Sequence, residues 1–199
     1  MTFIIIPGLD GSDAHHWQSR WEHEWLAPAV RIEPSSWSAP DLTDWSAAIT
    51  RAVNSTTGDI TFITHSLGCH ALTHWLAHSP TLSPVASPAE SPAAARIRGA
   101  FLVGPPDPEA PTFPVDRLPT FASLPAVALT IPSVLIASTN DPYCTIEAAT
   151  HLAKTWATPL IPLDNLGHIN SDSNLGQWPQ GQHLLTAFLA GTTPKADKP

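Results

Sequence analysis

The chain has 199 residues and carries 17 Asp and Glu against 9 Lys and Arg, so its formal charge is −8. An acidic chain with so few basic residues cannot build the patch that releases counterions from a phosphate backbone, and we expect no nucleic-acid partner. Apolar residues make up 43% of the chain, which excludes disorder for most of its length, and two cysteines exclude a disulfide scaffold. We predict one domain at residues 1–191 and a disordered tail at residues 192–199.

The first residues carry no targeting pattern. They have no basic start, and the apolar run at residues 3–6 stops at Pro7, which predicts neither a signal peptide nor a transit peptide. No segment approaches the roughly 20 apolar residues that a membrane helix needs. We therefore expect a soluble cytoplasmic protein with no membrane partner.

Short apolar runs alternate with longer amphipathic segments along the chain. Pro7 and Gly8 end the first run, and Asp41 or Thr43 can cap the first clear helix. Strands that alternate with helices predict an α/β fold in which parallel strands are covered by helices on both faces. We expect strands at residues 3–6, 30–33, 59–64, 100–103, 133–137 and 160–163, and helices at residues 43–53, 67–78, 145–156 and 181–189.

Two proline-rich segments fit neither kind of element, because closely spaced prolines are not tolerated inside helices. We expect a solvated loop at residues 79–92. The segment 104–132 follows a predicted strand and is a candidate cover for a pocket. Its large apolar residues are Phe113, Leu118, Phe121 and Leu124.

The most informative segment is residues 61–70, Thr-Phe-Ile-Thr-His-Ser-Leu-Gly-Cys-His, where Ser66 lies between a predicted strand and a predicted helix. Such a turn exposes the serine at the carboxyl end of a parallel sheet, where ligands bind in open α/β folds, and the Leu67 amide can donate to an oxyanion. The match to G-x-S-x-G is partial, because Thr64 replaces the first glycine while Gly68 supplies the second. A lone serine before such a helix can also be a cap, but the flanking strand and helix favour a nucleophile.

A nucleophilic serine needs a base, and the base needs a carboxylate that orients it. Asp141 and His168 each follow an apolar run that we predict to be a strand. Ser66, Asp141 and His168 occur in the chain order of the α/β-hydrolase triad. Asp164 is an alternative acid, although a residue only four positions before His168 is better suited to capping a loop, and Asp172 is a weaker alternative.

The glycine-rich loop at residues 7–12, Pro-Gly-Leu-Asp-Gly-Ser, follows the first predicted strand and is the expected source of a second oxyanion donor. We predict the Leu9 amide as this donor, with the Asp10 amide as the second choice. The glycines are also compatible with an ordinary turn that requires positive φ.

Residues after this loop are candidates for contact with a substrate. Trp17, Trp21 and Trp25 recur every four residues, which is typical of a helix face, and we expect Trp21 and Trp25 to pack in the core. Trp17 lies closest to the glycine-rich loop and is predicted to form a wall of the pocket. Gly11 and His16 are predicted to contact the substrate there.

These strings together resemble the family of retinoblastoma-binding protein 9 and YdeN, which are small serine hydrolases of the α/β-hydrolase fold. The resemblance covers about residues 3–190 and implies Ser66 as nucleophile, His168 as base and Asp141 as its partner. It also implies a three-layer fold with a mostly parallel sheet of about six strands and no large lid domain. The strings that carry it are residues 7–12 with His16-Trp17, residues 65–68, residues 140–144, and residues 167–170 with Gly176-x-Trp178-Pro179.

Some relatives bind a retinoblastoma-type protein through L-x-C-x-E. The corresponding residues 67–71, Leu-Gly-Cys-His-Ala, end in alanine, so this partner is not carried over and the protein partner stays unknown.

Two other groups of reactive side chains occur in the chain. His70, His74 and His78 recur every four residues, so two of them could bind one zinc ion. The third lies another turn, about 6 Å, further along the helix axis, and we therefore favour a partly exposed helix face over a metal site. Cys144 lies near a helix start, where thiol pKa values tend to fall. Since Ser66 is better placed as a nucleophile, we expect Cys144 and Cys69 to be packed residues.

The sequence therefore predicts a serine hydrolase, without metal or other cofactor, that cleaves a small carboxylic ester or amide through an acyl-enzyme on Ser66. The alternative is a protein-binding module that keeps the fold but performs little chemistry, because a fold does not guarantee a function. The threonine at position 64 motivates this alternative.

Overall fold

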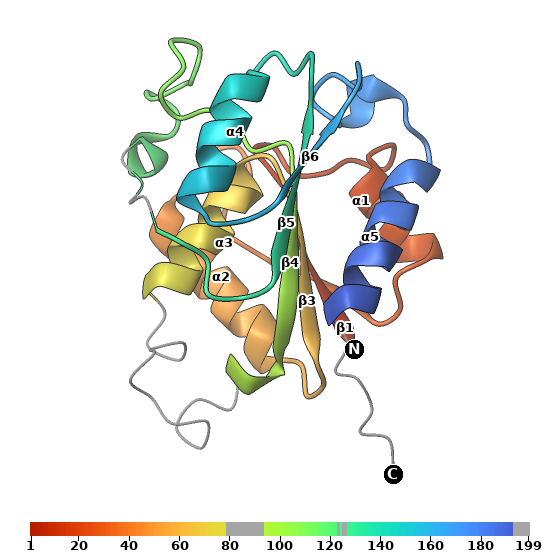
Figure 1. The fold of residues 1–199 in the computed structure, drawn as a ribbon. Helices are drawn as coiled ribbons and strands as arrows, with labels where there is room; N and C mark the ends of the chain where they lie inside the picture. Colours follow the sequence, from red (N-terminus) through yellow and green to blue (C-terminus); the bar gives the residue numbers. More distant parts are fainter. Residues whose placement is uncertain (79–93, 123, 125–126, 193–199) are drawn as a thin grey trace.

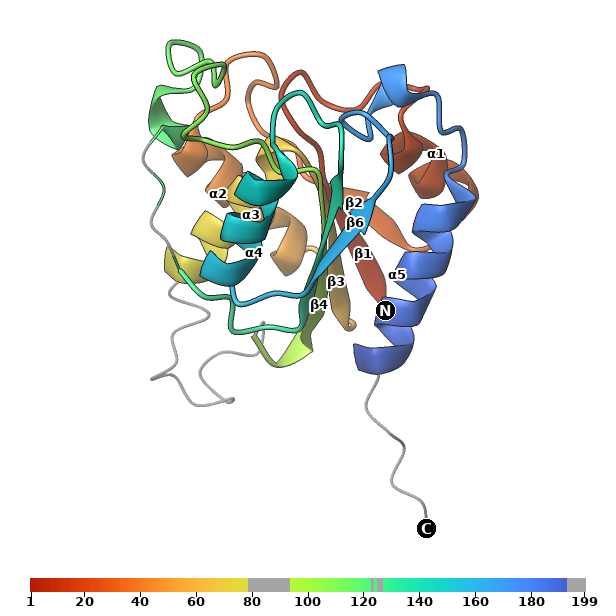
Figure 2. The same ribbon diagram turned by 45° about the horizontal axis from the view of Figure 1, so that its top comes forward.

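A parallel sheet forms the centre of the molecule. For residues 1–78, 94–122, 124 and 127–192, which the computed structural model describes, the sheet has six strands in the order β2-β1-β3-β4-β5-β6, and all neighbouring strands pair in parallel. Since all strands run in one direction, the loops that follow them meet at one edge of the sheet (Figure 2). The strands are β1 (Thr2–Ile6), β2 (Ala29–Arg31), β3 (Ile60–His65), β4 (Ile97–Val103), β5 (Ser133–Ser138) and β6 (Leu160–Leu163).

Helices cover both faces of this sheet (Figure 1). One face carries α2 (Leu42–Asn54), α3 (Leu67–His78) and α4 (Ile146–Thr155), and the opposite face carries α1 (Trp17–Glu24) and α5 (Pro179–Thr192). The predicted three-layer α/β fold with helices on both faces is therefore confirmed.

The central strands are rich in apolar residues because both of their faces are buried. Alternate side chains point to opposite faces. Ile4 and Phe62 pack in the cluster that includes residues of α2 and α3, whereas Ile5 and Ile63 pack in the cluster that includes residues of α1 and α5. This arrangement explains why residues 3–6 of β1 form a continuous apolar run rather than an alternating pattern.

The ends of the helices follow the expected capping chemistry. Asp41 accepts a hydrogen bond from the Asp44 amide at 2.9 Å, so it is the N-cap of α2. Thr145 caps α4 through the Ala148 amide, and the helix consequently begins one residue later than predicted.

The aromatic face of α1 is only partly buried. Trp21 lies in the core as predicted, but Trp25 is 39% exposed, so the prediction that it packs in the core is wrong. The helix ends at Glu24, and the backbone of Trp25 departs from helical geometry, with φ −134°. Its ring contacts the edge of the Trp21 ring from outside the core.

Some predictions fall outside the described residues. The loop expected at residues 79–92 lies outside them, as does the expected tail except for Thr192, which is the last residue of α5. Within the described residues, no helix combines the length and apolarity needed to cross a bilayer.

Candidate active site

Ser66 lies on the sharp turn between β3 and α3. Its φ of +54° is in the left-handed region, which is unfavourable for a residue with a side chain and marks stored strain. The Ser66 amide donates to Val103 O at 2.9 Å, and its carbonyl accepts from the Cys69 amide at 2.9 Å. A Cβ on Gly68 would lie 2.4 Å from the carbonyl oxygens of Ile6 and Pro7, so only glycine lets α3 pass so close to the end of β1.

The departure from the G-x-S-x-G pattern is accommodated by local packing. Thr64 is buried in β3, and its Oγ1 lies 3.0 Å from the Sγ of Cys69 on the first turn of α3. Burial raises the pKa of the Cys69 thiol to about 12, so it stays protonated. Thr64 and Cys69 thus bond to each other below the turn that carries Ser66.

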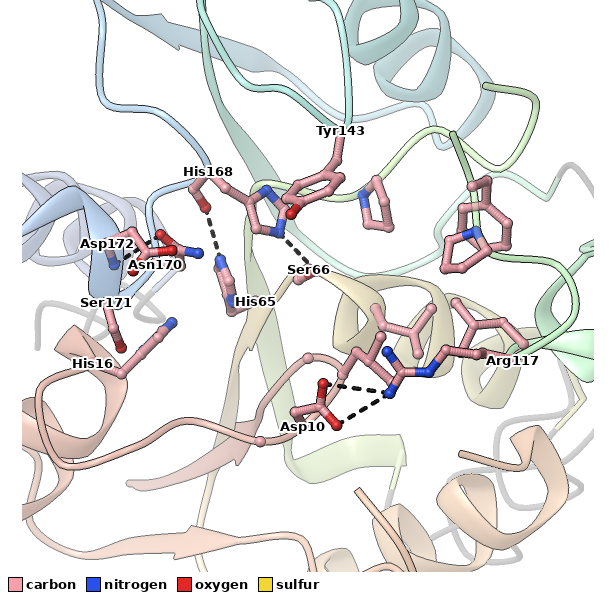
Figure 3. A pocket seen from close by; sticks show the side chains of 18 of the residues that line it. Asp10, His16, His65, Ser66, Arg117, Tyr143, His168, Asn170, Ser171 and Asp172 are labelled. Carbon is pink, nitrogen blue, oxygen red and sulfur yellow. Dashed lines mark hydrogen bonds and ion pairs between the residues drawn. The ribbon is translucent and has the colours of Figure 1, made fainter. Parts of the chain in front are cut away.

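Ser66, His168 and Asp141 form a continuous chain of hydrogen bonds, of which Figure 3 shows the bond between His168 and Ser66. His168 Nε2 lies 2.9 Å from Ser66 Oγ, and His168 Nδ1 lies 2.8 Å from Asp141 Oδ2 and 3.0 Å from Oδ1. The Asp141 side chain is 1% exposed and also accepts from the Tyr143 amide at 2.9 Å. Because a carboxylate only accepts, Nδ1 carries the proton and the Nε2 lone pair faces the serine hydroxyl, which is the tautomer that a general base requires.

The loop that carries His168 is attached to the loop after β5. The Gly167 amide donates to Asn140 Oδ1 at 2.7 Å, and the Leu166 amide donates to Ser138 Oγ at 2.9 Å. These bonds explain how residues from the ends of β5 and β6, which are far apart in sequence, bring Asp141 and His168 together. Neither rival acid takes this place, because Asp164 and Asp172 are both exposed and the Nδ1 of His168 bonds to Asp141.

Trp17 contacts the loop that carries His168 and does not line the cavity. The predicted substrate contact is wrong, because the Trp17 side chain is 1% exposed and packs in the core against Trp21 and Trp178. Its Nε1 donates to the carbonyl of Ile169, the residue after His168, at 2.7 Å. The position of the ring is decided by this long-range bond, which no local pattern reveals.

The glycine-rich loop approaches Ser66 closely. A Cβ on Gly8 would lie 2.7 Å from Ser66 Cβ and 3.1 Å from Ser66 Oγ, so the next amide, that of Leu9, lies near the serine. The Asp10 amide donates to Trp37 O at 2.9 Å, which makes it unavailable to an oxyanion and corrects the second choice made from the sequence. Within the described residues, the Leu9 and Leu67 amides have no such acceptor.

A cavity of about 560 Å³ opens beside Ser66 and His168. Gly11 and His16, the predicted substrate contacts, are among the residues that line it. One wall is polar, and the opposite wall carries most of the apolar residues (Figure 3). The polar side includes Asp13, His16, Asn170, Ser171 and Asp172. The opposite side, called the apolar side below, includes Leu9, Pro106, Phe113, Pro114 and Leu118 together with the polar residues Asp10, Asp107, Thr112 and Arg117.

The apolar side comes largely from the proline-rich segment after β4. Phe113 and Leu118 reach the cavity, whereas Phe121 is fully buried in the core and Leu124 packs against that core. Arg117, at the rim, forms an exposed ion pair with Asp10 at 3.3 Å (Figure 3). The predicted cover is therefore one wall of the cavity.

Two residues at the site were missed from the sequence. His65 lines the cavity and lies directly before Ser66, and the only local signal was a polar residue at the end of a buried strand. The ring of Tyr143 meets that of His168 edge-on, with centroids 4.7 Å apart. The position of Tyr143, two residues after the predicted acid Asp141, could have indicated that it lies at the site.

The histidines of α3 and Cys144 have contacts of their own. His70 Nε2 lies 2.8 Å from Pro106 O, and the rings of His74 and His78 stack on each other. Among the described residues there is no group of three or more potential metal ligands. Cys144 is buried, and burial raises its pKa to about 12, so it is a packed thiol as expected.

A serine, an imidazole and a buried carboxylate connected in this way at the carboxyl edge of a parallel sheet are the arrangement of a serine hydrolase with the α/β-hydrolase fold. The family model described as serine hydrolase matches residues 3–187, and the chain belongs to this family. It is a hydrolase enzyme, and the predicted relationship to YdeN-like hydrolases is confirmed by solved structures. A comparison with curated proteins finds no match.

Among similar structures, a YdeN-like hydrolase from Pectobacterium atrosepticum is 30% identical, with a TM-score of 0.79 over 97% of this chain and 92% of that one. The ydeN gene product from Bacillus subtilis is 22% identical, with a TM-score of 0.75 over 95% and 98% of the two chains. Esterase 2 from Thermogutta terrifontis shares the fold at 17% identity and a TM-score of 0.66, over 99% of this chain and 85% of that one. The described residues of this chain form no large lid over the sheet.

Proposed function

We propose that the chain is a carboxyl-ester hydrolase that works by acyl transfer through Ser66. The observation that carries this proposal is the unbroken hydrogen-bond chain from Ser66 Oγ through the His168 ring to the buried Asp141 carboxylate. The strained serine, the two unpaired amides beside it and the adjoining cavity supply the other parts that acyl transfer needs.

The mechanism has two steps. Ser66 Oγ attacks the carbonyl carbon of the ester while His168 Nε2 takes the hydroxyl proton, and the Leu9 and Leu67 amides stabilise the resulting oxyanion. The carbon–oxygen bond to the alcohol then breaks, and His168 returns the proton to the departing alkoxide. In the second step His168 takes a proton from water, and the oxygen of this water attacks the acyl carbon. The bond between that carbon and Ser66 Oγ then breaks, His168 returns the proton to Ser66 Oγ, and the carboxylic acid is released.

The substrate is proposed to be a small molecule. The cavity volume suits a small ligand, and its apolar side suits the hydrocarbon part of an acyl or alcohol group. An ester is favoured over an amide because an alkoxide is expelled more easily than an amide anion. The name esterase, which the Thermogutta terrifontis neighbour carries, supports the same choice.

The test combines active-site labelling with turnover. A fluorophosphonate probe should label wild-type protein on Ser66, and a panel of short-chain nitrophenyl esters should be hydrolysed. Ser66→Ala should abolish labelling and lower kcat by about 10⁴-fold or more, with nearly unchanged thermal stability. Ser55→Ala, which alters the C-terminal cap of α2 outside the cavity lining, is the matched control and should keep full activity.

The alternative function is that of a protein-binding module with little chemistry. Folded wild-type protein that is neither labelled nor active on any ester of the panel would favour this alternative over the hydrolytic mechanism.

A further inference from the structure

Three histidine rings lie in a row beside the nucleophile. His65, the last residue of β3, lies between His16 and His168, and its ring centroid is 4.6 Å from that of His16 and 4.9 Å from that of His168. His65 is only 4% exposed and takes no part in the proton transfers described above. Its Nε2 lies 2.9 Å from the backbone carbonyl oxygen of His168 (Figure 3).

This contact fixes the protonation of His65. A carbonyl oxygen can only accept a hydrogen bond, so Nε2 of His65 carries the hydrogen and donates it. Burial lowers the pKa of His65 well below 6.5, and the neighbouring rings of His16 and His168 lower it further. His65 is therefore a neutral donor at neutral pH.

His16 is held in a fixed tautomer behind it. Its Nδ1 accepts from the Gln18 amide at 3.1 Å, which caps α1 and leaves the hydrogen on Nε2. Burial lowers the pKa of His16 to about 3, so this ring is also neutral. The other two rings of the row therefore add no charge near the proposed base.

The backbone that His65 contacts is strained. Gly167 and Ile169, on either side of His168, have φ of +58° and +51°. The left-handed conformation is especially unfavourable for a β-branched residue such as Ile169, and it persists only where the surroundings hold it. The structure supplies two ring donors at this point, since His65 bonds to the carbonyl of His168 and Trp17 bonds to that of Ile169.

We propose that His65 is a positioning residue for His168: its ring N–H holds the His168 carbonyl, and thereby the strained loop that directs His168 Nε2 to Ser66. This inference rests on the proposed function. Neutrality matters because His168 becomes a cation when it takes the serine proton, and a second cation one ring away would oppose that step. A displacement of about 1 Å at such a site can cost a factor of about 100 in rate, so a lost anchor should be visible in kcat.

The experiment compares three replacements of His65. The side chain of His65→Gln keeps a neutral N–H at about the position of Nε2. The side chain of His65→Asn is one methylene shorter, so its amide does not reach the carbonyl of His168, and His65→Leu has no donor. We expect His65→Leu and His65→Asn to lower kcat on the best nitrophenyl ester by about 10- to 100-fold with little change in KM, and His65→Gln to recover most of the loss.

Trp75→Phe is the matched control. Trp75 is also a buried residue whose ring N–H donates a hydrogen bond, to Thr50 Oγ1 at 2.9 Å, but neither residue lines the cavity. The loss of this hydrogen bond should lower thermal stability while kcat stays within about threefold of wild type, because a removed buried donor costs stability wherever it lies.

The outcomes separate the two proposals. Wild-type protein that is neither labelled nor active contradicts the proposed function itself. Two results obtained with an active wild type would overturn only the positioning role. In the first, His65→Leu and His65→Asn are as active as Trp75→Phe; in the second, His65→Gln is as impaired as His65→Asn. Should His65→Leu fail to fold, the comparison of Gln with Asn, which differ by one methylene, still decides.

Discussion

The two walls of the cavity are held in place by different means. The loop that carries His168 is fixed by side chains from three other parts of the chain, including His65 from β3, Trp17 from α1 and Asn140 after β5. The opposite wall, around Phe113, is held mainly by hydrogen bonds within its own turns, and its ion pair of Arg117 with Asp10 is largely exposed, at 51% and 59%.

This difference suggests that the two walls have different roles, one in proton transfer and the other in substrate binding. Proton transfer between Ser66 and His168 tolerates little displacement, so the wall that carries the base needs many anchors. A wall that only receives the apolar part of a substrate needs a shape, and a shape can change through loop substitutions without disturbing the base. We therefore expect mutations on the first side to alter kcat and mutations on the second side to alter KM.

The largest effect should follow from Asp141→Asn. The amide cannot hold the same His168 tautomer, and in comparable triads this change costs about 10⁴-fold in kcat. We expect a similar loss on nitrophenyl esters, with much slower labelling of Ser66 by a fluorophosphonate. Asp164→Asn, the exposed rival acid, is the control and should retain activity. Equal losses in the two variants would show that Asp141 is not the working partner.

A smaller loss is expected from Gly8→Ala. The new Cβ would lie 2.7 Å from Ser66 Cβ, so the glycine-rich loop must move and carry the Leu9 amide with it. Loss of one oxyanion donor typically lowers kcat by about 10²- to 10³-fold. Gly58→Ala, which meets only Met1 N at 4.0 Å, should be nearly neutral in the same assay. A fully active Gly8→Ala enzyme would remove this loop from the oxyanion site.

A further effect concerns stability against pH and depends on His70, whose Nε2 donates to the carbonyl of Pro106 at one end of the apolar wall. Burial lowers the pKa of His70 to about 4, so as pH falls the unfolded chain takes up this proton near 6.5 and the folded chain only near 4. The free energy of unfolding should therefore fall between these values, by about 3 kcal/mol for this one group. His70→Gln keeps an N–H donor but does not titrate. The free energy of unfolding, measured by denaturant melts between pH 7 and pH 4, should therefore depend on pH less steeply than in wild type, by the equivalent of about one proton. An unchanged slope would mean that His70 already binds a proton in the folded state.

The smallest effect should come from Arg117→Ala. An exposed ion pair of this kind is worth less than about 1 kcal/mol, so stability should hardly change. We expect KM for nitrophenyl esters to shift by no more than a few fold and kcat to stay constant, measured in parallel with wild type. A large loss in kcat would contradict the division of labour between the two walls.

The sequence predicted the sheet, its helices and the three residues of the hydrogen-bond chain because these depend on local patterns. Asp141 and His168 each follow a buried strand, and the ends of parallel strands meet at one edge. The wrong predictions concern groups whose position or hydrogen bond depends on a residue far away in the sequence. The Asp10 amide is occupied by the carbonyl of Trp37, and Trp17 is drawn under the active-site loop by the carbonyl of Ile169. Neither partner is visible from residues near it in the chain.

The two outer strands of the sheet also bear on how the enzyme behaves at high concentration. At one margin β2 has only three residues, and at the other β6 presents an exposed proline, Pro162, which has no N–H to offer. A neighbouring molecule that tried to extend the sheet would find few backbone groups to bond with on either side. The short β2 and the proline in β6 thus discourage edge-to-edge aggregation of the sheet at high protein concentration.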